Sequence, residues 1–347
     1  MNIHRSQPLE IVGGGIAGLA LGSALRRAGV PVTVFETQGY PRHRVCGEFI
    51  AGLDEASTAR LGVGPLLQDA RRHRRVVWRR HGRTIREHDL PAPALGLSRY
   101  VLDARLAGAF VDAGGDLRTS IRVPPDSAPE GRVFAAGRRR QPSPWLGLKV
   151  HVRGLRLAGD LEVHLGDQAY VGLSGVEDCR VNVCGLFRRR LLPSGESAAT
   201  GVALLLRYLD AAGLEELGRR LRAAEIDADS FCAVAALPFR RQAPASGRLC
   251  IGDSFAMPPP FTGNGMAMAL QGAALACDPL IAWARGTTSW PDTIEIIQRR
   301  LRRHFRLRLA CAQAVHSFLL EPPRQWWLAA AGRLRLLPLR PLYQLTH

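Results

Sequence analysis

The chain has 347 residues, of which 46% are hydrophobic, and its formal net charge is +17. The apolar fraction is sufficient for a buried core and excludes a disordered chain. The arginines are dispersed and accompany no nucleic-acid-binding module, so we expect no nucleic-acid partner. The seven cysteines form no C-x-x-C pair, so we expect neither a metal site nor a disulfide framework. The sequence contains no secretory signal and no run of about 18 apolar residues, and we expect a cytoplasmic protein.

The first structural signal lies in residues 8–36, which read PLEIVGGGIAGLALGSALRRAGVPVTVFE. A short apolar run predicts a strand over 9–12. A helix with many small residues is expected over 16–28, and a second strand over 32–35. This order of strand, glycine-rich turn, helix and strand is typical of a dinucleotide-binding βαβ unit.

Three glycines in this turn have the spacing G-x-G-x-x-G. Gly13 permits the tight turn, Gly15 lets a pyrophosphate approach the backbone, and Gly18 lets the helix pack closely on the strand. The helix N-terminus then faces the phosphates. Glu36 follows the second strand, where a carboxylate can bind the hydroxyl groups of a ribose.

A second glycine-rich segment, residues 251–266, reads IGDSFAMPPPFTGNGM. Asp253 follows a short apolar strand, and three prolines (258–260) stiffen the turn after it. Gly263 and the residues after it begin a helix whose N-terminal amides carry partial positive charge.

Two further segments carry a family resemblance. Residues 40–49 read YPRHRVCGEF, and residues 98–103 read SRYVLD at the start of a helix expected over 100–113. With these segments and both glycine motifs, the chain resembles the FAD-dependent oxidoreductases of the para-hydroxybenzoate hydroxylase and geranylgeranyl reductase superfamily. The resemblance implies non-covalent FAD, with NAD(P)H as a transient electron donor. The cofactor-binding residues it implies are Gly13, Gly15, Ala17, Gly18, Glu36, Arg44, Gly47, Arg99, Asp253, Pro260, Gly263, Asn264, Gly265 and Met266.

The sequence departs from the hydroxylase pattern at one place. Ala136 and Gly137 stand where the hydroxylases usually have Asp-Gly, so the chain lacks a carboxylate there. This departure puts in doubt whether the chain uses NADPH as those hydroxylases do.

The fold class expected is α/β, with a Rossmann-like FAD-binding domain of the glutathione-reductase type and an inserted antiparallel-sheet substrate domain. Residues 145–187 alternate in polarity as four strands would, and 76–89 reads as a hairpin. The expected FAD-binding domain comprises 1–74, 96–142 and 238–290, the substrate domain comprises 75–95 and 143–237, and a tail covers 291–347.

The resemblance leaves the reaction open. A monooxygenase would hydroxylate or oxidise an aromatic or polyketide-like small molecule through a flavin hydroperoxide. A reductase like the geranylgeranyl reductases would reduce an alkene on a lipid-like chain, and the Cys-Gly-Glu of residues 46–48 resembles that branch. A non-catalytic FAD-binding protein is a third alternative, whereas a halogenase is disfavoured because its W-x-W-x-I-P motif is absent.

Lys149 and Cys46 are the candidate catalytic residues. Lys149 is the only lysine in the chain and shares one face of a predicted strand with Trp145, Gly147 and His151. It could face flavin or substrate as a compact cation, or it could be a surface lysine without a role. Cys46 could donate a proton in a reductase, or it could be a half-buried loop thiol.

The tail begins with a basic amphipathic helix over 293–320. Its apolar stripe, opposite an arginine-rich face, comprises Ile294, Ile297, Leu301, Phe305 and Leu309. This helix could pack on the FAD-binding domain, or it could contact an anionic membrane peripherally.

Overall fold

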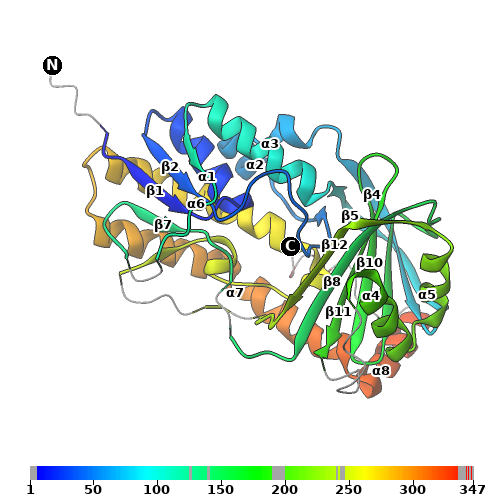
Figure 1. Ribbon diagram of the computed structural model, residues 1–347. Coiled ribbons are helices and arrows are strands. Elements are labelled where there is room, and N and C mark those ends of the chain that lie inside the picture. Colours follow the sequence, from blue (N-terminus) through cyan, green and yellow to red (C-terminus); the bar gives the residue numbers. More distant parts are fainter. Residues whose placement is uncertain are drawn as a thin grey trace.

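A computed structural model describes residues 6–124, 127–138, 141–189, 200–239, 241–242, 247–334, 341, 343 and 345. The chain forms two sheets that lie beside each other, and both are covered by helices (Figure 1). We refer to the two parts as the parallel domain and the antiparallel domain.

The parallel domain contains a five-stranded sheet whose named pairings are all parallel. The central strands are mostly buried, as is usual for parallel sheets covered by helices. Helix α1 packs against both α3 and α6. The strands in order across the sheet are β13 (Leu249–Cys250), β7 (Arg132–Phe134), β1 (Leu9–Val12), β2 (Val32–Phe35) and β6 (Asp116–Arg118). The helices are α1 (Ile16–Arg27), α2 (Glu55–Leu61), α3 (Arg99–Asp112), α6 (Asn264–Ala284) and α7 (Trp290–Leu320), with 3-10 turns η1 (Gly64–Leu67), η4 (Gly252–Ser254) and η5 (Pro260–Thr262).

The predicted βαβ unit is confirmed in its elements, and so is the close packing that requires glycine at position 18. A Cβ atom on Gly18 would lie 2.0 Å from the carbonyl oxygen of Gly13, so only glycine allows this approach of helix to strand. Gly13 has φ of 112°, and a Cβ there would lie 2.4 Å from the Ala135 oxygen at the end of β7. The first glycine therefore packs the turn onto the neighbouring strand.

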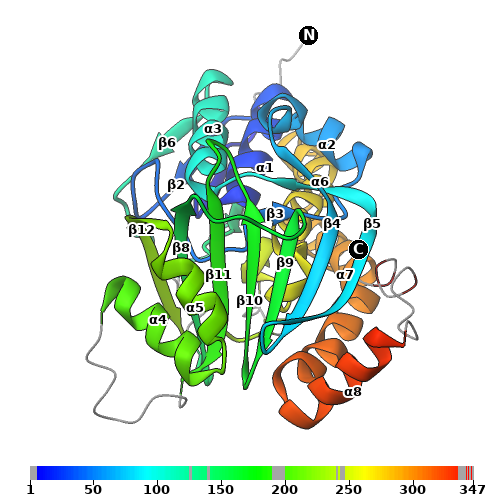
Figure 2. The same ribbon diagram turned by 90° about the vertical axis from the view of Figure 1, so that its right-hand side faces the viewer.

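The antiparallel domain contains an eight-stranded sheet, seen face-on in Figure 2. Leu148, Val150 and Val152 on one face pack with helices α4 and α5, and the other face is directed toward the parallel domain. The pairings are antiparallel except for β4 with β9. The strands in order are β12 (Glu225–Ala235), β8 (Trp145–Arg153), β11 (Val181–Arg188), β10 (Ala169–Gly175), β9 (Leu161–Gly166), β4 (Arg71–Arg80), β5 (Arg83–Gly96) and β3 (Phe49–Ile50), and the associated helices are α4 (Gly201–Ala211), α5 (Glu215–Arg222) and α8 (Pro322–Arg333).

The predicted hairpin and the four predicted strands are present, but the predicted boundary at residue 75 is displaced. Strand β4 begins at Arg71, and β3, which was assigned to the FAD-binding domain, pairs with β5. Both differences arise from the C-terminal end of β5, because Leu95 and Gly96 pair with the first residues of β4 and also with β3. The sheet therefore continues beyond the residues whose polarity alternates.

The predicted amphipathic helix of the tail is α7, and its stripe is buried in the parallel domain. Ile297, Leu301 and Phe305 are at most 2% exposed and belong to the same hydrophobic cluster as α1 and α6. The stripe therefore serves packing, the first of the two alternatives, and is not free to contact a membrane. Among the described residues, one helix, α6, is long and apolar enough to cross a membrane, but 61% of its most apolar window is buried inside the protein.

Candidate functional site

The N-terminus of α1 faces open space beside Gly15. Gly15 is the N-cap residue, no side chain caps the helix, and the first turn contains no acidic residue. A Cβ atom on Gly15 would lie 4.0 Å from Nη2 of Arg99. Free amides opposite a guanidinium form a site for an anion, because both groups present positive charge to the space between them.

Glu36 lies directly after β2, beside the glycine turn, and is 5% exposed. Its Oε2 accepts a hydrogen bond from the Gly14 amide at 2.8 Å and lies 3.0 Å from Nη2 of Arg42. Burial acts to raise the pKa of this carboxyl group, but the charge of Arg42 and the hydrogen bond from Thr37 lower it below its ordinary value. The predicted ribose-binding acid is therefore ionised and held at the edge of the turn.

The second glycine motif lies next to the first. Gly263 is the N-cap of α6 with φ of 69°, and no side chain caps this helix either. A Cβ on Gly265 would have no atom within 4 Å, so space is open there as well. A Cβ on Gly252 would lie 3.0 Å from Cβ of Ala17 in the first turn of α1. This contact brings the two predicted motifs together. Asn264 and Met266, also predicted, are buried at the start of α6.

Charged groups connect the two motifs. Arg99 donates to the fully buried Asp103 through Nε at 2.7 Å and Nη2 at 2.8 Å. Nε of Arg44 lies 3.5 Å from the same carboxylate. Burial raises the pKa of Asp253, while the charges of Arg99 and Arg44 act in the opposite direction. Three of the predicted cofactor-binding side chains, Arg44, Arg99 and Asp253, are therefore close enough to influence one another's charge.

The loop formed by Cys46, Gly47 and Glu48 is attached to the antiparallel sheet. Oγ of Ser174 on β10 donates to the Gly47 carbonyl at 2.7 Å, and Nδ2 of Asn182 on β11 donates to the Cys46 carbonyl at 3.0 Å. These two polar side chains face the parallel domain. They fix the backbone of the loop to the sheet.

A buried ionic cluster reinforces this attachment. Glu48, Lys149 and His151 are all 0% exposed. Nζ of Lys149 lies 3.4 Å from Oε1 of Glu48, and Nε2 of His151 lies 2.5 Å from Oε2. Nδ1 of His43 lies 3.2 Å from the lysine nitrogen. Burial acts to raise the pKa of Glu48, but the His151 hydrogen bond and the Lys149 charge lower it.

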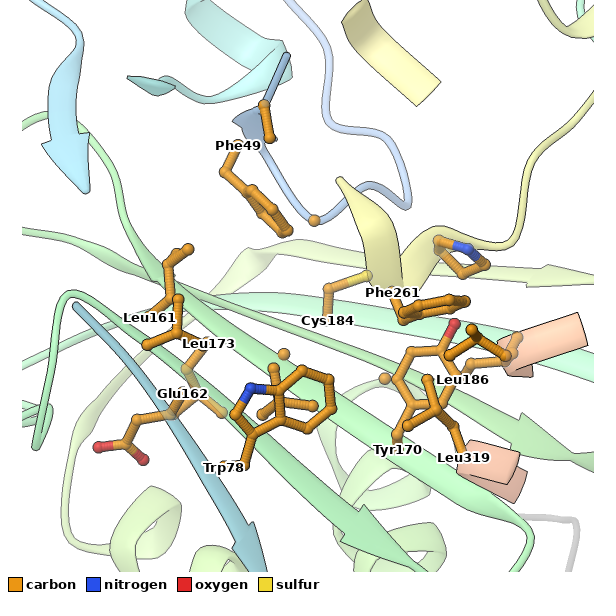
Figure 3. Close-up of a pocket in the computed structure, with 18 of the residues that line it drawn as sticks. Phe49, Trp78, Leu161, Glu162, Tyr170, Leu173, Cys184, Leu186, Phe261 and Leu319 are labelled. Atoms are coloured by element: carbon orange, nitrogen blue, oxygen red, sulfur yellow. The ribbon is translucent and has the colours of Figure 1, made fainter. Parts of the chain in front are cut away.

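A cavity of about 240 Å³ lies between this loop and the sheet. Figure 3 shows Phe49 of strand β3 and Phe261 of the parallel domain facing other side chains of the antiparallel sheet, among them Trp78 and Tyr170. The carboxylate of Glu162, by contrast, is bound by His164 at 2.7 Å and Arg220 at 2.9 Å. The lining includes Cys46, Gly47, Pro260 and Phe261 from the parallel domain and the loop before β3, Phe49, Trp78, Leu161, Tyr170, Leu173, Cys184 and Leu186 from the antiparallel sheet, and Val315, Leu319 and Leu328 from the C-terminal helices.

The two candidate catalytic residues differ in position. Cys46 lines the cavity, and burial raises the pKa of its thiol. Lys149 shares its sheet face with Gly147, which lines the cavity, but its ammonium group contacts Glu48 and His43. Glu48, Asn182 and Ser174 were not predicted as site residues. The sequence signal for Asn182 and Ser174 is the alternation that puts polar side chains on one face of otherwise apolar strands, whereas Glu48 is the last residue of the Cys-Gly-Glu segment.

Comparison with known proteins supports the predicted fold. Residues 11–45 match the family model described as an NAD(P)-binding Rossmann-like domain. A menaquinone reductase of Mycobacterium tuberculosis is 32% identical over 119 residues. That match covers 33% of this chain and 29% of the reductase, so the chain spans less than a third of this relative in the alignment.

Similar solved structures cover nearly the whole chain. The structure of HpxO of Klebsiella pneumoniae, complexed with FAD and uric acid, superimposes with a TM-score of 0.74 at 17% sequence identity. The alignment covers 100% of this chain and 98% of the HpxO chain. PqsL of Pseudomonas aeruginosa, a probable FAD-dependent monooxygenase, has a TM-score of 0.65 at 16% identity, with 98% of each chain covered. The chain therefore has the fold of the FAD-dependent monooxygenases, and the predicted fold class is confirmed.

Proposed function

We propose that this chain is an FAD-dependent oxidoreductase, and that it acts as a monooxygenase on an apolar aromatic or polyketide-like small molecule. The observation that carries the proposal is the position of the apolar cavity. Its walls include Gly47 of segment 40–49 and Pro260 of segment 251–266. Both segments are among those that carry the flavoprotein resemblance. A small molecule in this cavity would therefore lie against the cofactor site.

The residues present fit FAD. The space beside Gly15, bounded by free amides and Arg99, suits a pyrophosphate. Glu36 is positioned for the ribose hydroxyls and Asp253 for the ribityl chain. The free amides of Gly265 and its neighbours at the start of α6 would favour negative charge on the flavin ring. Ala17, Gly18 and Gly13 contribute by packing, because they let the backbone approach this closely.

FAD, when bound, would supply electron-pair transfer and the activation of oxygen. The chain's own contribution is to bind and orient the substrate and to exclude water. The apolar side chains of the sheet and of the C-terminal helices enclose the substrate, so solvent has little access to the reacting groups. NAD(P)H is the proposed electron donor and would bind transiently.

We assign Lys149 a positioning role. Its ammonium group contacts Glu48, and Glu48 follows the two loop residues that line the cavity. The pair therefore holds Cys46 and Gly47 in place, and Lys149 acts through the loop. Cys46 itself is positioned to contact the substrate.

A second candidate function is reduction of a carbon–carbon double bond in an apolar molecule. The match to menaquinone reductase favours it. The cavity lining is compatible with a lipid-like chain, and Cys46, whose raised pKa keeps the thiol protonated, could give up a proton.

Isotope labelling distinguishes the two reactions. The FAD-loaded protein is incubated with NADPH under ¹⁸O₂, with 1-naphthol as an aromatic probe and a menaquinone as an alkene probe. The monooxygenase proposal predicts a product that contains one ¹⁸O atom. A menaquinone product whose isoprenoid side chain gains two hydrogen atoms and no label, located there by fragment masses after reoxidation of the quinone ring, would support the reductase. If neither NADH nor NADPH nor dithionite reduces the flavin, the protein is a non-catalytic FAD-binding protein.

A further inference from the structure

Two residues that line the cavity carry buried hydrogen-bond donors that have no acceptor among the described residues. The indole nitrogen Nε1 of Trp78 and the guanidinium nitrogen Nε of Arg86 are both buried without a partner, and both residues line the cavity. Buried donors are almost always paired in proteins. Two unpaired donors on residues that line one apolar cavity therefore require an explanation.

The two residues are neighbours in the sheet. Trp78 on β4 pairs directly with Arg86 on β5, and Val76 on β4 pairs with His88. Side chains that are directly opposite each other, or two residues apart along a strand, share a face of the sheet. His88 also lines the cavity, and its buried Nδ1 has no partner in the described part of the chain. Burial, together with the charge of Arg86, lowers the pKa of His88 and keeps its ring neutral.

Packing alone does not explain these residue types. Phenylalanine at position 78 would fill the cavity wall without an unpaired N–H group, and methionine at position 86 would do so without a charge. The hydroxyl of Tyr170 on β10 also lacks an acceptor among the described residues, although it neighbours Phe261. Figure 3 shows Trp78 and Tyr170 directed to the same cavity from different strands.

We propose that the β4–β5 hairpin forms a polar subsite of the cavity, in which Trp78 and Arg86 bind an oxygen acceptor on the substrate. The substrate is then an apolar ring system or chain that carries a carbonyl, phenolate or carboxylate oxygen, and not a pure hydrocarbon. This inference rests on the proposed function for its reaction, but the subsite itself is a binding site. A site built to pair a substrate oxygen discriminates strongly against an analogue that lacks it.

Matched probes test the subsite. Tetralin, 1-tetralone and 1-naphthoate have similar bicyclic skeletons and carry no acceptor, a neutral acceptor and an anionic acceptor. We expect both oxygenated probes to bind the FAD-loaded, oxidised protein at least about tenfold more tightly than tetralin in calorimetric titration. Tighter binding of tetralone supports a carbonyl substrate, and tighter binding of naphthoate supports an anionic one.

Two variants test whether the preference for oxygenated probes over tetralin depends on the β4–β5 hairpin. Trp78→Phe should weaken binding of the oxygenated probes about 2- to 12-fold and leave tetralin unchanged. Arg86→Met should do the same, with a larger loss for naphthoate because a charged hydrogen bond is removed. Arg83→Met, an exposed arginine at the start of β5, is the matched control and should alter no probe.

Equal affinity for tetralin and both oxygenated probes would overturn the inference, as would an equal loss for all three in Trp78→Phe and Arg86→Met. The titrations are repeated with protein from which FAD has been removed. Failure of FAD to bind would contradict the proposed function, whereas the probe preference tests the subsite. The two results are therefore separable.

Discussion

Lys149 and Glu48 form an ion pair between the sheet and the cavity loop, with both side chains 0% exposed and Nζ 3.4 Å from Oε1. His151 and the backbone amide of Arg99 also donate to Glu48, at 2.5 Å and 3.0 Å. The carboxylate is thus compensated by groups from both domains. This arrangement explains why a chain that otherwise uses arginine has a lysine here: the buried space accepts a compact ammonium group.

Removal of one partner of the Lys149–Glu48 ion pair should lower the free energy of unfolding. Lys149→Met leaves the Glu48 carboxylate buried with less compensation, so we expect the free energy of unfolding to fall by about 3–5 kcal/mol. The double variant Lys149→Met, Glu48→Gln should recover part of that loss. Urea unfolding of both variants and the parent measures this. A loss below about 1 kcal/mol in Lys149→Met would contradict a structural ion pair.

The substitution Lys149→Arg keeps the positive charge but changes the size of the group, so it tests whether Lys149 positions the cavity loop. The larger guanidinium should displace the loop, so the KM for an apolar substrate should rise more than kcat falls. Steady-state kinetics measures the split. Unchanged turnover and KM would remove any role for Lys149 in the reaction.

The open space beside Gly15 should be needed for FAD binding but not for the stability of the fold. Gly15 has φ of −88°, which any residue adopts, and its Cβ position is open. Gly15→Val should therefore keep the melting temperature of the FAD-free protein but weaken FAD binding by at least about tenfold, or ~1.4 kcal/mol. Gly18→Ala is the contrasting variant. Its Cβ would lie 2.0 Å from the Gly13 oxygen, so it should destabilise the fold itself. Equal FAD affinity in Gly15→Val would show that the pyrophosphate binds elsewhere.

Cys46 should react slowly with alkylating agents. Burial raises the pKa of its thiol, whereas Cys179 is exposed. Because the thiolate is the reacting species, iodoacetamide at pH 7.5 should modify Cys179 well before Cys46. Mass spectrometry of peptides from a time course gives both rates. Faster modification of Cys46 would contradict a protonated thiol, and full activity of Cys46→Ser would show that any proton donor is elsewhere.

Stability should fall as the pH is lowered from about 6.5 toward about 4. Burial and the charge of Lys149 lower the pKa of His43 from 6.5 to about 4, and burial alone lowers that of His316 to about 4. Between these values the unfolded chain binds protons that the folded chain does not, so acid favours unfolding. The stabilisation is complete above pH 6.5 and is lost as the pH approaches 4.

Thermal unfolding between pH 7.5 and 4.5 measures this dependence. His316 lies among the rings of Trp145, Tyr170, Phe239 and Phe261, so phenylalanine can replace it. His316→Phe should flatten the decrease in melting temperature. A melting temperature that is constant or rises on acidification would contradict the lowered pKa values.

The features predicted from the sequence are those that local patterns encode. Gly18 contacts the backbone of Gly13 within the same motif, so the spacing of these glycines alone indicates this contact. The contact of Gly13 with Ala135 involves a strand that is distant in sequence and was not predicted. The alternation along β8 likewise predicted that Lys149 and His151 share a face, and both contact Glu48.

The remaining features depend on contacts between distant segments. Asn182 and Cys46 are far apart in the chain, and nothing in either local sequence specifies their hydrogen bond. Trp78 and Arg86 read as ordinary residues of a polar hairpin, and only the folded sheet shows that both residues line a cavity and that one nitrogen of each is buried without a partner among the described residues. The burial of the α7 stripe likewise depends on α6, which packs against it.

The most direct test of the account is a calorimetric titration of the FAD-free protein with FAD and, separately, with NAD⁺. Two adjacent helix N-termini, Arg99 and the carboxylates of Glu36 and Asp253 predict that one FAD binds per chain and that NAD⁺ binds much more weakly. Saturable binding of NAD⁺ with no binding of FAD would contradict the central claim that this fold holds a flavin.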